Sequence, residues 1–344
     1  MKLPTLFLSC DWGTTSFRLR LVSLAERRLV GQLIEPAGVK AINARIPQAD
    51  RGSCAARATA FAEFLRAKVE QLCRDQAPPA AGLPIVISGM ASSTVGWQEV
   101  PYATTPFPLD GSALRYAEQR LETASGALPV YLLSGLSTGA DIMRGEEHEV
   151  LGLMASPEAR SLRDESVVIL PGTHSKHVFI RHGWVVDFTT YMTGELFEVL
   201  ATQSLLKVSV QWPLRGNGES ATALRPSEQA AFLVGVEMAK ERGLAASLFR
   251  ARARSVLDHV PAVENGWFLS GLLIGAELVD LVSVSARVPI ILAAAEPHRA
   301  AYELASTHLS AADRLVKISE ATISQATVLA HAQFLERLVN HGQT

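Results

Sequence analysis

The sequence is poor in cysteine, in aromatic residues and in excess charge, and each shortage excludes a class of protein. Three cysteines, Cys10, Cys54 and Cys73, are too few and odd in number for a disulfide framework, so they indicate a reducing compartment. The formal net charge is −2 and aromatic residues make up only 6% of the chain. Because no basic stripe with interleaved aromatics is present, we do not expect a nucleic acid partner.

Long apolar runs are also missing. We find no window with the roughly 18 apolar residues that a membrane span needs. The first apolar run, Leu3 to Leu8, is interrupted by Pro4 and followed by Asp11. It is shorter than the apolar region of about 7–15 residues in a secretion signal. We therefore interpret it as a buried first strand, and expect a cytoplasmic protein with no membrane partner.

The residues that are present predict a duplicated α/β protein. A chain of 344 residues suits two domains better than one core. In the first half, periodicity predicts strands at 5–11, 17–24, 29–35, 84–88 and 129–134. It also predicts a helix after Ser53 and helices at 112–124 and 145–155. In the second half it predicts strands at 166–171, 176–181, 184–188, 266–270, 288–294 and 314–319, with helices from Thr193 and at 227–242, 244–259, 272–285, 297–309 and 319–341. Without the extra helices, both halves begin with the order βββαβαβα, and the second continues with a last strand and the final helix, which indicates an internal repeat.

A short Gly-Thr-x-Ser turn also occurs twice, each time at the first hairpin of a half. The turns are Gly13 to Ser16 and Gly172 to Ser175, followed by the bases Arg18 and Lys176. Small residues let backbone N–H groups converge on an oxyanion, so a facing pair of turns would hold a polyphosphate. Phosphoryl transfer requires this kind of positioning and charge neutralisation. For either turn alone, a plain hairpin whose hydroxyls satisfy their own backbone is the alternative.

Longer motifs extend this interpretation to a known superfamily. The stretches "DWGTTSFR" (11–18), "LPGTHSKHV" (170–178) and "WFLSGLLIGAEL" (267–278) resemble the two phosphate motifs and the adenosine motif of the sugar kinase, heat-shock chaperone and actin superfamily. Within it, four blocks resemble the 2-dehydro-3-deoxygalactonokinase family: "GMASSTVGWQEVPY" (89–102), "DIMRGEE" (141–147), "PGTHSKH" (171–177) and "TYMTGEL" (190–196). One departure is Ser270-Gly271, where many members of the superfamily have two glycines.

The resemblance implies two ribonuclease H-like (actin-like ATPase) domains of repeated βββαβαβα order with an interdomain cleft. We expect a first domain at 1–144, a second at 145–318, and a C-terminal helix within 319–344 that packs back on the first. The implied activity is ATP- and Mg²⁺-dependent phosphorylation of the 6-hydroxyl of 2-dehydro-3-deoxy-D-galactonate in D-galactonate degradation. The expected partners are the sugar acid and ATP. A homodimer is compatible with the sequence, which does not give the oligomeric state.

Site residues follow from the turns and from the resemblance. Asp11, at the end of the first strand, is placed to hold Mg²⁺ directly or through water. The residues expected to bind nucleotide and phosphate are Gly13, Thr14, Thr15, Arg18, Gly172, Thr173, Ser270, Gly271 and Gly275. The general base is expected to be Glu146, with Glu147 and Asp141 as alternatives. The residues expected to contact the sugar acid are Trp97, Glu99, Tyr102, Arg144, His174, Lys176, Tyr191 and Glu195, some of them through its carboxylate.

Other functions share this fold and these motifs. An exopolyphosphatase-like phosphohydrolase would use the same "GEE" acids to activate water. A kinase of another 2-keto-3-deoxy sugar acid would need the same sites, and a non-catalytic nucleotide-binding module would need only the turns. Fold alone does not separate them. ADP formation that depends strictly on a sugar acid would exclude the phosphohydrolase.

Overall fold

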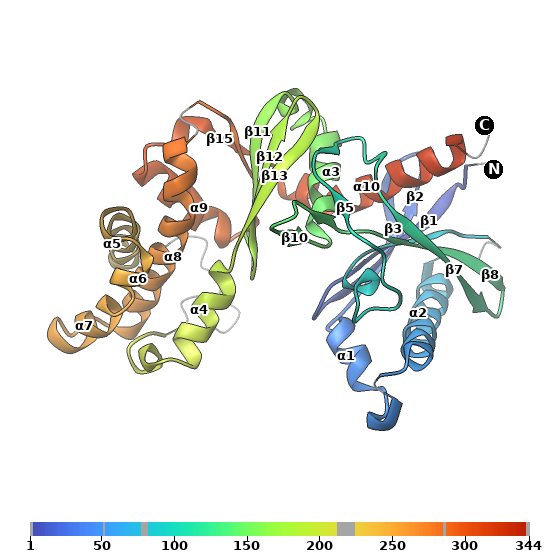
Figure 1. Cartoon of the computed structure of the whole chain (residues 1–344), viewed down its shortest axis with the longest axis horizontal. Helices are drawn as coiled ribbons and strands as arrows, with labels where there is room; N and C mark the ends of the chain where they lie inside the picture. Colours follow the sequence, from blue (N-terminus) through green and yellow to red (C-terminus); the bar gives the residue numbers. More distant parts are fainter. Residues whose placement is uncertain (1–2, 51, 77–81, 212–223, 285–286, 342–344) are drawn as a thin grey trace. The chain divides into compact units, whose positions relative to one another are not determined.

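The first half of the chain forms a six-stranded mixed sheet in the computed structural model, which describes residues 3–50, 52–76, 82–211, 224–284 and 287–341 (Figure 1). Its strands run in the order β3-β2-β1-β4-β8-β7. Their bounds are β1 Leu6–Trp12, β2 Phe17–Ser23, β3 Arg28–Glu35, β4 Ile85–Gly89, β7 Tyr116–Thr123 and β8 Gly126–Leu133. β1 pairs antiparallel with β2 but parallel with β4, and β4 is parallel to β8.

The second half repeats this strand order. Its sheet runs β15-β14-β11-β12-β13-β6, with β14 parallel to both β11 and β15. The bounds are β11 Glu165–Leu170, β12 Ser175–Arg181, β13 Trp184–Tyr191, β14 Ile290–Leu292 and β15 Leu315–Lys317, with β6 (Phe107–Pro108) paired to the start of β13. In both sheets the third, second, first and fourth strands lie side by side, as in the ribonuclease H-like order, and the fourth strand is followed by β8 in the first sheet and by β15 in the second. A small third sheet joins β5 (Ala103–Thr104), β9 (Leu136–Ser137) and β10 (Ile142–Met143).

The helices complete the two halves, and in the second half several of them pack on one another rather than on a sheet. In the first half they are α1 Val39–Ala44, α2 Cys54–Gln76 and α3 Glu146–Ala155. In the second half they are α4 Thr193–Thr202, α5 Pro226–Arg242, α6 Leu244–Ser247, α7 Arg250–Leu257, α8 Ala262–Val284, α9 His298–His308 and α10 Glu320–His341. The second half thus follows the predicted order βββαβαβα, with α5 to α8 grouped after α4.

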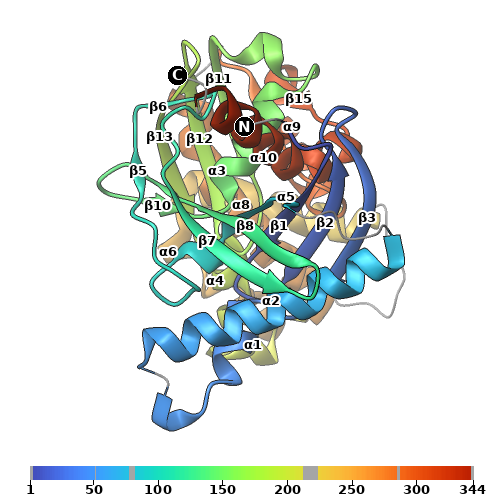
Figure 2. The same ribbon diagram turned by 90° about the vertical axis from the view of Figure 1, so that its right-hand side faces the viewer.

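Alternate residues of β1 show how the first sheet is covered on both faces. Leu8, Cys10 and Trp12 point into a core shared with α2. Phe7 points the other way, into a core shared with Val328, Ala332 and Leu335 of α10. Successive side chains of a strand face opposite sides of the sheet, so a strand buried on both faces is nearly continuously apolar. Figures 1 and 2 show α2 and α10 on opposite faces of this sheet.

The helix predicted at 112–124 is wrong, because residues 116–123 form the strand β7. Exposed and more buried side chains alternate along β7, with Leu121 pointing into the core. β7 pairs antiparallel with β8 across a hairpin that ends at Gly126, whose φ is +115°. Ala, Glu, Gln, Arg and Leu favour helix intrinsically, but the period of two and the neighbouring strand override that preference. The first half therefore has a strand where the repeated order predicted a helix.

The strand predicted at 266–270 is also wrong, because "GWFLS" lies within α8. This helix is buried on nearly all sides, so its sequence has no helical apolar stripe and resembles a buried strand. Its glycines allow close packing on α5. A Cβ added at Gly271 would lie 2.0 Å from the carbonyl oxygen of Phe232, and one at Gly235 would lie 2.2 Å from that of Phe268. Figure 1 shows the two helices side by side.

α8 bears on the expectation that no segment of the chain is apolar enough to span a membrane. By length and composition it could cross a membrane, with a mean hydropathy of 1.3 over Ala262–Val282. In the structure, 72% of its most apolar window is buried inside the protein. It also carries Glu277, whose carboxylate is fully buried and hydrogen-bonded. These features are typical of a core helix.

The chain divides into two compact units. Unit 1 contains Met1–Asp164, Arg181–Asp187 and Ser324–Thr344, and unit 2 contains Glu165–Ile180 and Phe188–Ile323. α3 lies in unit 1, whereas the sequence assigned it to the second domain. Close packing accounts for the difference, because a Cβ added at Gly152 of α3 would lie 1.7 Å from the carbonyl oxygen of Ala326 in α10.

Candidate functional site

In unit 1, three of the sequence motifs meet at the carboxyl ends of β1 and β4. The parallel register pairs Asp11 with Ser88 and Trp12 with Gly89. Gly89 has a φ of +89°, and a Cβ there would lie 2.8 Å from the carbonyl oxygen of Trp12. Gly145, with a φ of +121°, faces Gly89 and begins α3. Such a sheet edge is where open α/β folds bind ligands.

The first Gly-Thr turn joins β1 to β2 and is held from behind by α1. The N–H of Gly13 donates to the carbonyl of Ser16 at 2.9 Å, and the N–H of Val39 donates to the carbonyl of Gly13 at 3.0 Å. Gly38, just before α1, touches the turn so closely that a Cβ would lie 2.3 Å from the carbonyl oxygen of Thr14. Thr14 and its neighbour Thr15 remain exposed.

The second Gly-Thr turn, in unit 2, is held in the same way. It joins β11 to β12, and the N–H of Glu195 in α4 donates to the carbonyl of Thr173 at 3.1 Å. Gly194 packs on the turn, so that a Cβ there would lie 2.7 Å from the carbonyl oxygen of Gly172. Gly172 and Thr173 are exposed. In both units, therefore, the helix that follows the third strand supports the turn. The internal repeat thus includes this helix as well as the strands.

Asp11 lies in a group of charged side chains. Its carboxylate accepts a hydrogen bond from Arg18 at 2.9 Å. The nearby Glu149 of α3 was missed by the sequence analysis. Burial, followed by the negative charges of Asp11 and Glu146, raises the pKa of Glu149 to about 8. Glu149 lies one helical turn after Glu146, so helical spacing would have placed both acids on one face.

The three candidate bases have different surroundings. Glu146 is half-buried at the start of α3 and accepts the N–H of Arg144 at 3.1 Å. Glu147 is buried, accepts the N–H of Gly145 at 2.8 Å, and lies 2.7 Å from the ring of His148. Asp141 accepts the N–H of Ile142 in its own turn at 2.7 Å. Glu147 is thus directed into the core of unit 1.

Arg144 joins the "DIMRGEE" block to the "GMASSTVGWQEVPY" block. Its guanidinium donates to the carbonyl of Ser92 at 2.7 Å and to that of Val100 at 3.1 Å, and it stacks on the ring of Tyr102 at 4.1 Å. Trp97 is buried in the core of unit 1, and Glu99 is exposed. Arg144 therefore holds the 89–102 segment in place by hydrogen bonds, and Trp97 anchors it in the core of unit 1.

The predicted sugar-acid residues of unit 2 lie around the second turn. His174 and Glu195 form an exposed pair whose Nε2 and Oε2 are 2.5 Å apart. Lys176 is buried and donates to Thr190 Oγ1 at 2.8 Å. Burial, then the charges of Asp280 and Glu277, raises the pKa of Tyr191. Lys176 is thus part of the sheet packing, whereas His174 and Glu195 are accessible.

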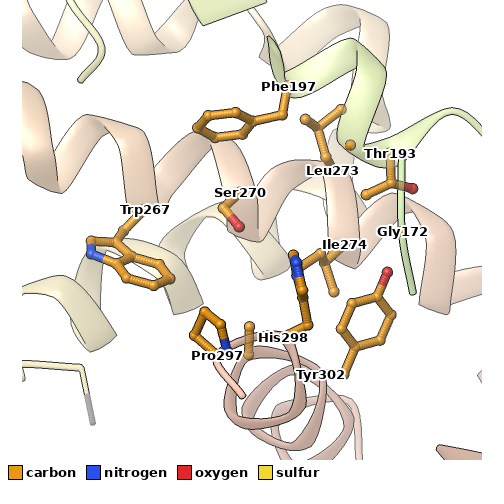
Figure 3. A pocket seen from close by; sticks show the side chains of 12 residues that line it. Gly172, Thr193, Phe197, Trp267, Ser270, Leu273, Ile274, Pro297, His298 and Tyr302 are labelled. Atoms are coloured by element: carbon orange, nitrogen blue, oxygen red, sulfur yellow. The ribbon is translucent and has the colours of Figure 1, made fainter. Parts of the chain in front are cut away.

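A pocket opens beside the second turn, entirely within unit 2. Figure 3 shows Ser270 and His298 inside it, with Trp267 and Tyr302 on opposite sides. The other lining residues are Gly172, Thr193, Gly194, Phe197, Leu273, Ile274, Pro297 and Ala301. Of the predicted adenosine residues, Ser270 lines the pocket, but Gly271 and Gly275 face α5. Trp267 and His298 were missed because only the folded helices α8 and α9 bring them together.

Two ribonuclease H-like units, each with a Gly-Thr turn at its first hairpin, define the actin-like ATPase fold. Within this class the chain belongs to the 2-keto-3-deoxy-galactonokinase family, whose profile matches residues 11–328.

Named relatives agree with this assignment. A probable 2-dehydro-3-deoxygalactonokinase of Rhizobium meliloti (strain 1021) is 33% identical over 298 residues, which is 82% of each chain. The 2-dehydro-3-deoxygalactonokinase of Escherichia coli (strain K12) is 30% identical over 282 residues, or 80% of each. A crystal structure of a candidate 2-dehydro-3-deoxygalactonokinase protein from Sinorhizobium meliloti has a TM-score of 0.75 at 26% identity, covering 96% of this chain and 99% of that one.

Proposed function

We propose that the chain is an ATP-dependent kinase that phosphorylates the 6-hydroxyl of 2-dehydro-3-deoxygalactonate. The observation that carries this proposal is the family match over residues 11–328, which includes both Gly-Thr turns and the "GEE" acids. Two relatives that cover four fifths of the chain bear the name of this activity. The other hypotheses, a phosphohydrolase and a non-catalytic module, have no comparable support.

The two Gly-Thr turns are proposed to bind the phosphates of the same ATP. Support comes from their exposed threonines, Thr14, Thr15 and Thr173, and from the helix that fixes each turn from behind. Exposed hydroxyls and turn N–H groups donate to phosphate oxygens, and a fixed backbone does so without reorganisation. Arg18 would add positive charge near the first turn.

The pocket of unit 2 is proposed to hold the nucleoside. Its walls are mostly apolar, with Trp267 on one side and the polar groups of Ser270 and His298 inside (Figure 3). This is the composition of small-ligand sites, in which apolar area gives affinity and a few polar groups fix orientation. Gly271 and Gly275 would act indirectly, by letting α8 pack closely on α5.

Glu146 is proposed as the general base. Its carboxylate would take the proton of the 6-hydroxyl while that oxygen forms a bond to the γ-phosphorus and ADP leaves with the bridging oxygen. Glu147 is less suitable because its carboxylate is buried against Gly145 and His148. Asp141 remains an alternative. Glu149 lies one turn further along α3, and the charge of Glu146 contributes to its raised pKa.

Mg²⁺ is proposed at Asp11. No group of three or more His, Cys, Asp or Glu side chains arranged to hold a metal occurs among the described residues. Mg²⁺ usually takes one or two carboxylates, several waters and the phosphates of its substrate, so a single aspartate fits that chemistry. After burial, the negative charges of Asp11 and Glu146 contribute to the raised pKa of Glu149, so several carboxyl groups lie near Asp11, which suits a cation. When bound, Mg²⁺ would neutralise phosphate charge.

The sugar acid is proposed to contact the accessible members of the predicted set. These are Glu99 and Tyr102 in unit 1, and His174, Tyr191 and Glu195 in unit 2. Trp97, Arg144 and Lys176 would support these residues from within, since each is packed or already hydrogen-bonded. A cytoplasmic location and a homodimer stay proposals of the same kind.

A coupled assay tests the proposal. ADP release is measured with ATP, Mg²⁺ and each of several 2-keto-3-deoxy sugar acids, in galacto and gluco configuration. We expect release only with a sugar acid, and fastest with 2-dehydro-3-deoxygalactonate. Release without any sugar acid would favour a phosphohydrolase, and a gluco preference would change the substrate.

A further inference from the structure

Glu277 is a buried carboxylate with four hydrogen-bond partners, and the proposed function gives it no role. It lies on α8, one turn after the pocket residue Ile274, and is only 1% exposed. Oε1 accepts from Ser175 Oγ at 2.9 Å and from His177 Nε2 at 2.8 Å. Oε2 accepts from Thr193 Oγ1 at 2.6 Å and from the hydroxyl of Tyr302 at 2.8 Å.

The four donors come from elements that are far apart in the sequence. Ser175 and His177 belong to β12, directly after the second Gly-Thr turn, Thr193 begins α4, and Tyr302 lies in α9. Ser175 Oγ and the Tyr302 hydroxyl are also 3.0 Å apart. One carboxylate thus connects the phosphate turn, the helix behind it and both helices of the pocket. Thr193 and Tyr302 line that pocket themselves (Figure 3).

A buried carboxylate is a costly way to stabilise a core. Apolar residues of similar volume usually stabilise a protein as well or better, whereas loss of one partner of a buried charge is strongly destabilising. Directional bonds, however, fix relative positions more narrowly than apolar contacts do. Burial, followed by the charge of Glu277, raises the pKa of Tyr302 well above its ordinary value, so its hydroxyl stays a donor.

We infer that Glu277 is a positioning residue for the nucleotide: it sets the spacing between the 172–175 turn, which would hold phosphate, and the pocket wall, which would hold the nucleoside. The inference rests on the proposed function, because it takes the pocket and the turn to serve one nucleotide. A misplacement of about 1 Å between such groups can reduce a rate about 10²-fold.

The test measures ADP affinity of the full-length protein by titration calorimetry, together with thermal unfolding and KM for ATP. Glu277→Gln keeps the shape of the side chain but replaces one carboxylate oxygen, which accepts hydrogen bonds, with an amide NH₂ group, which donates them. Ser175→Ala removes one donor at a side chain that is fully buried and so cannot touch a ligand itself. We expect the Kd for ADP and the KM for ATP to rise about tenfold in both, with KM for the sugar acid nearly unchanged.

Ser247→Ala is the matched control. Ser247 is also buried in unit 2 and donates to the carbonyl of Gly243 at 2.8 Å, away from the pocket. It should lower Tm without changing the Kd for ADP. If Ser175→Ala and Glu277→Gln lower Tm but bind ADP like the wild type, Glu277 is only structural and the inference is wrong. If Glu277→Gln does not fold, the Kd of Ser175→Ala for ADP alone decides whether the inference holds. Wild-type protein that binds no ADP would instead contradict the proposed function.

Discussion

Glu146 and Glu147 are neighbours in the sequence, but the fold gives their carboxylates different surroundings. Glu147 is turned inward against Gly145 and His148, while Glu146 stays half-buried at the start of α3. Glu146→Gln should lower kcat about 10²–10⁴-fold and leave KM for ATP nearly unchanged, since the base contacts only the sugar hydroxyl. Steady-state kinetics of Glu146→Gln and Asp141→Asn, side by side, check this. A larger loss in Asp141→Asn would make Asp141 the base.

Glu149 predicts a pH dependence of stability. Its pKa is raised in the folded chain to about 8 from an ordinary value of 4.5, so between these values the folded chain keeps a proton that the unfolded chain has released. The contribution of this group to the free energy of unfolding is therefore full below about pH 4.5 and is lost as pH rises to about 8. Glu149→Gln should raise Tm over wild type more at pH 9 than at pH 5, by calorimetry in EDTA. Glu122→Gln, on the exposed face of β7, serves as control. An equal difference at both pH values would refute the assignment.

Asp11 carries the metal proposal. Asp11→Asn should keep the fold, because the side chain is partly exposed and its bond to Arg18 contributes at most about 1 kcal/mol. It should raise the Mg²⁺ concentration needed for half-maximal rate at least about tenfold, because a carboxylate binds the ion better than an amide. Mn²⁺ binding in the presence of ADP, followed by electron paramagnetic resonance, provides a readout independent of turnover. Unchanged Mn²⁺ affinity would remove Asp11 from the metal site.

At the scale of elements, the repeat extends to the glycines behind the two turns. Gly38 and Gly194 each allow a helix N-terminus to touch a Gly-Thr turn, and a Cβ at either would lie under 3 Å from turn backbone. Gly38→Ala and Gly194→Ala should therefore shift the turns and weaken ADP binding about tenfold, measured by calorimetry. Gly52→Ala, where a Cβ meets nothing within 4 Å, should bind normally. Normal binding in all three variants would show that the turns do not hold phosphate.

The elements also show what the sequence could and could not predict. Strands β1 to β4 and both Gly-Thr turns were predictable from apolar runs and small residues. β7 was not, because its residues favour helix and only pairing with β8 makes them a strand. α8 was divided in error because burial on all sides removes the helical stripe. In both cases tertiary contacts override the local pattern.

Residues of the candidate site could be proposed from the sequence only where a motif is local. Asp11, Gly13, Gly172 and Glu146 follow from short motifs. Trp267 and His298 come from separate helices that meet only in the folded pocket. Glu149 and Glu277 lie inside motif-bearing helices, yet their importance depends on burial and on distant partners that no linear pattern displays.

At the scale of the whole molecule, both units are proposed to serve one phosphoryl transfer to a sugar acid. The most direct measurement is ³¹P nuclear magnetic resonance of the products formed from ATP, Mg²⁺ and 2-dehydro-3-deoxygalactonate. We predict ADP and one phosphomonoester at the 6-position in equal amounts, with no inorganic phosphate beyond the enzyme-free control. Inorganic phosphate as the main product, or no turnover of this sugar acid, would contradict the proposed kinase function.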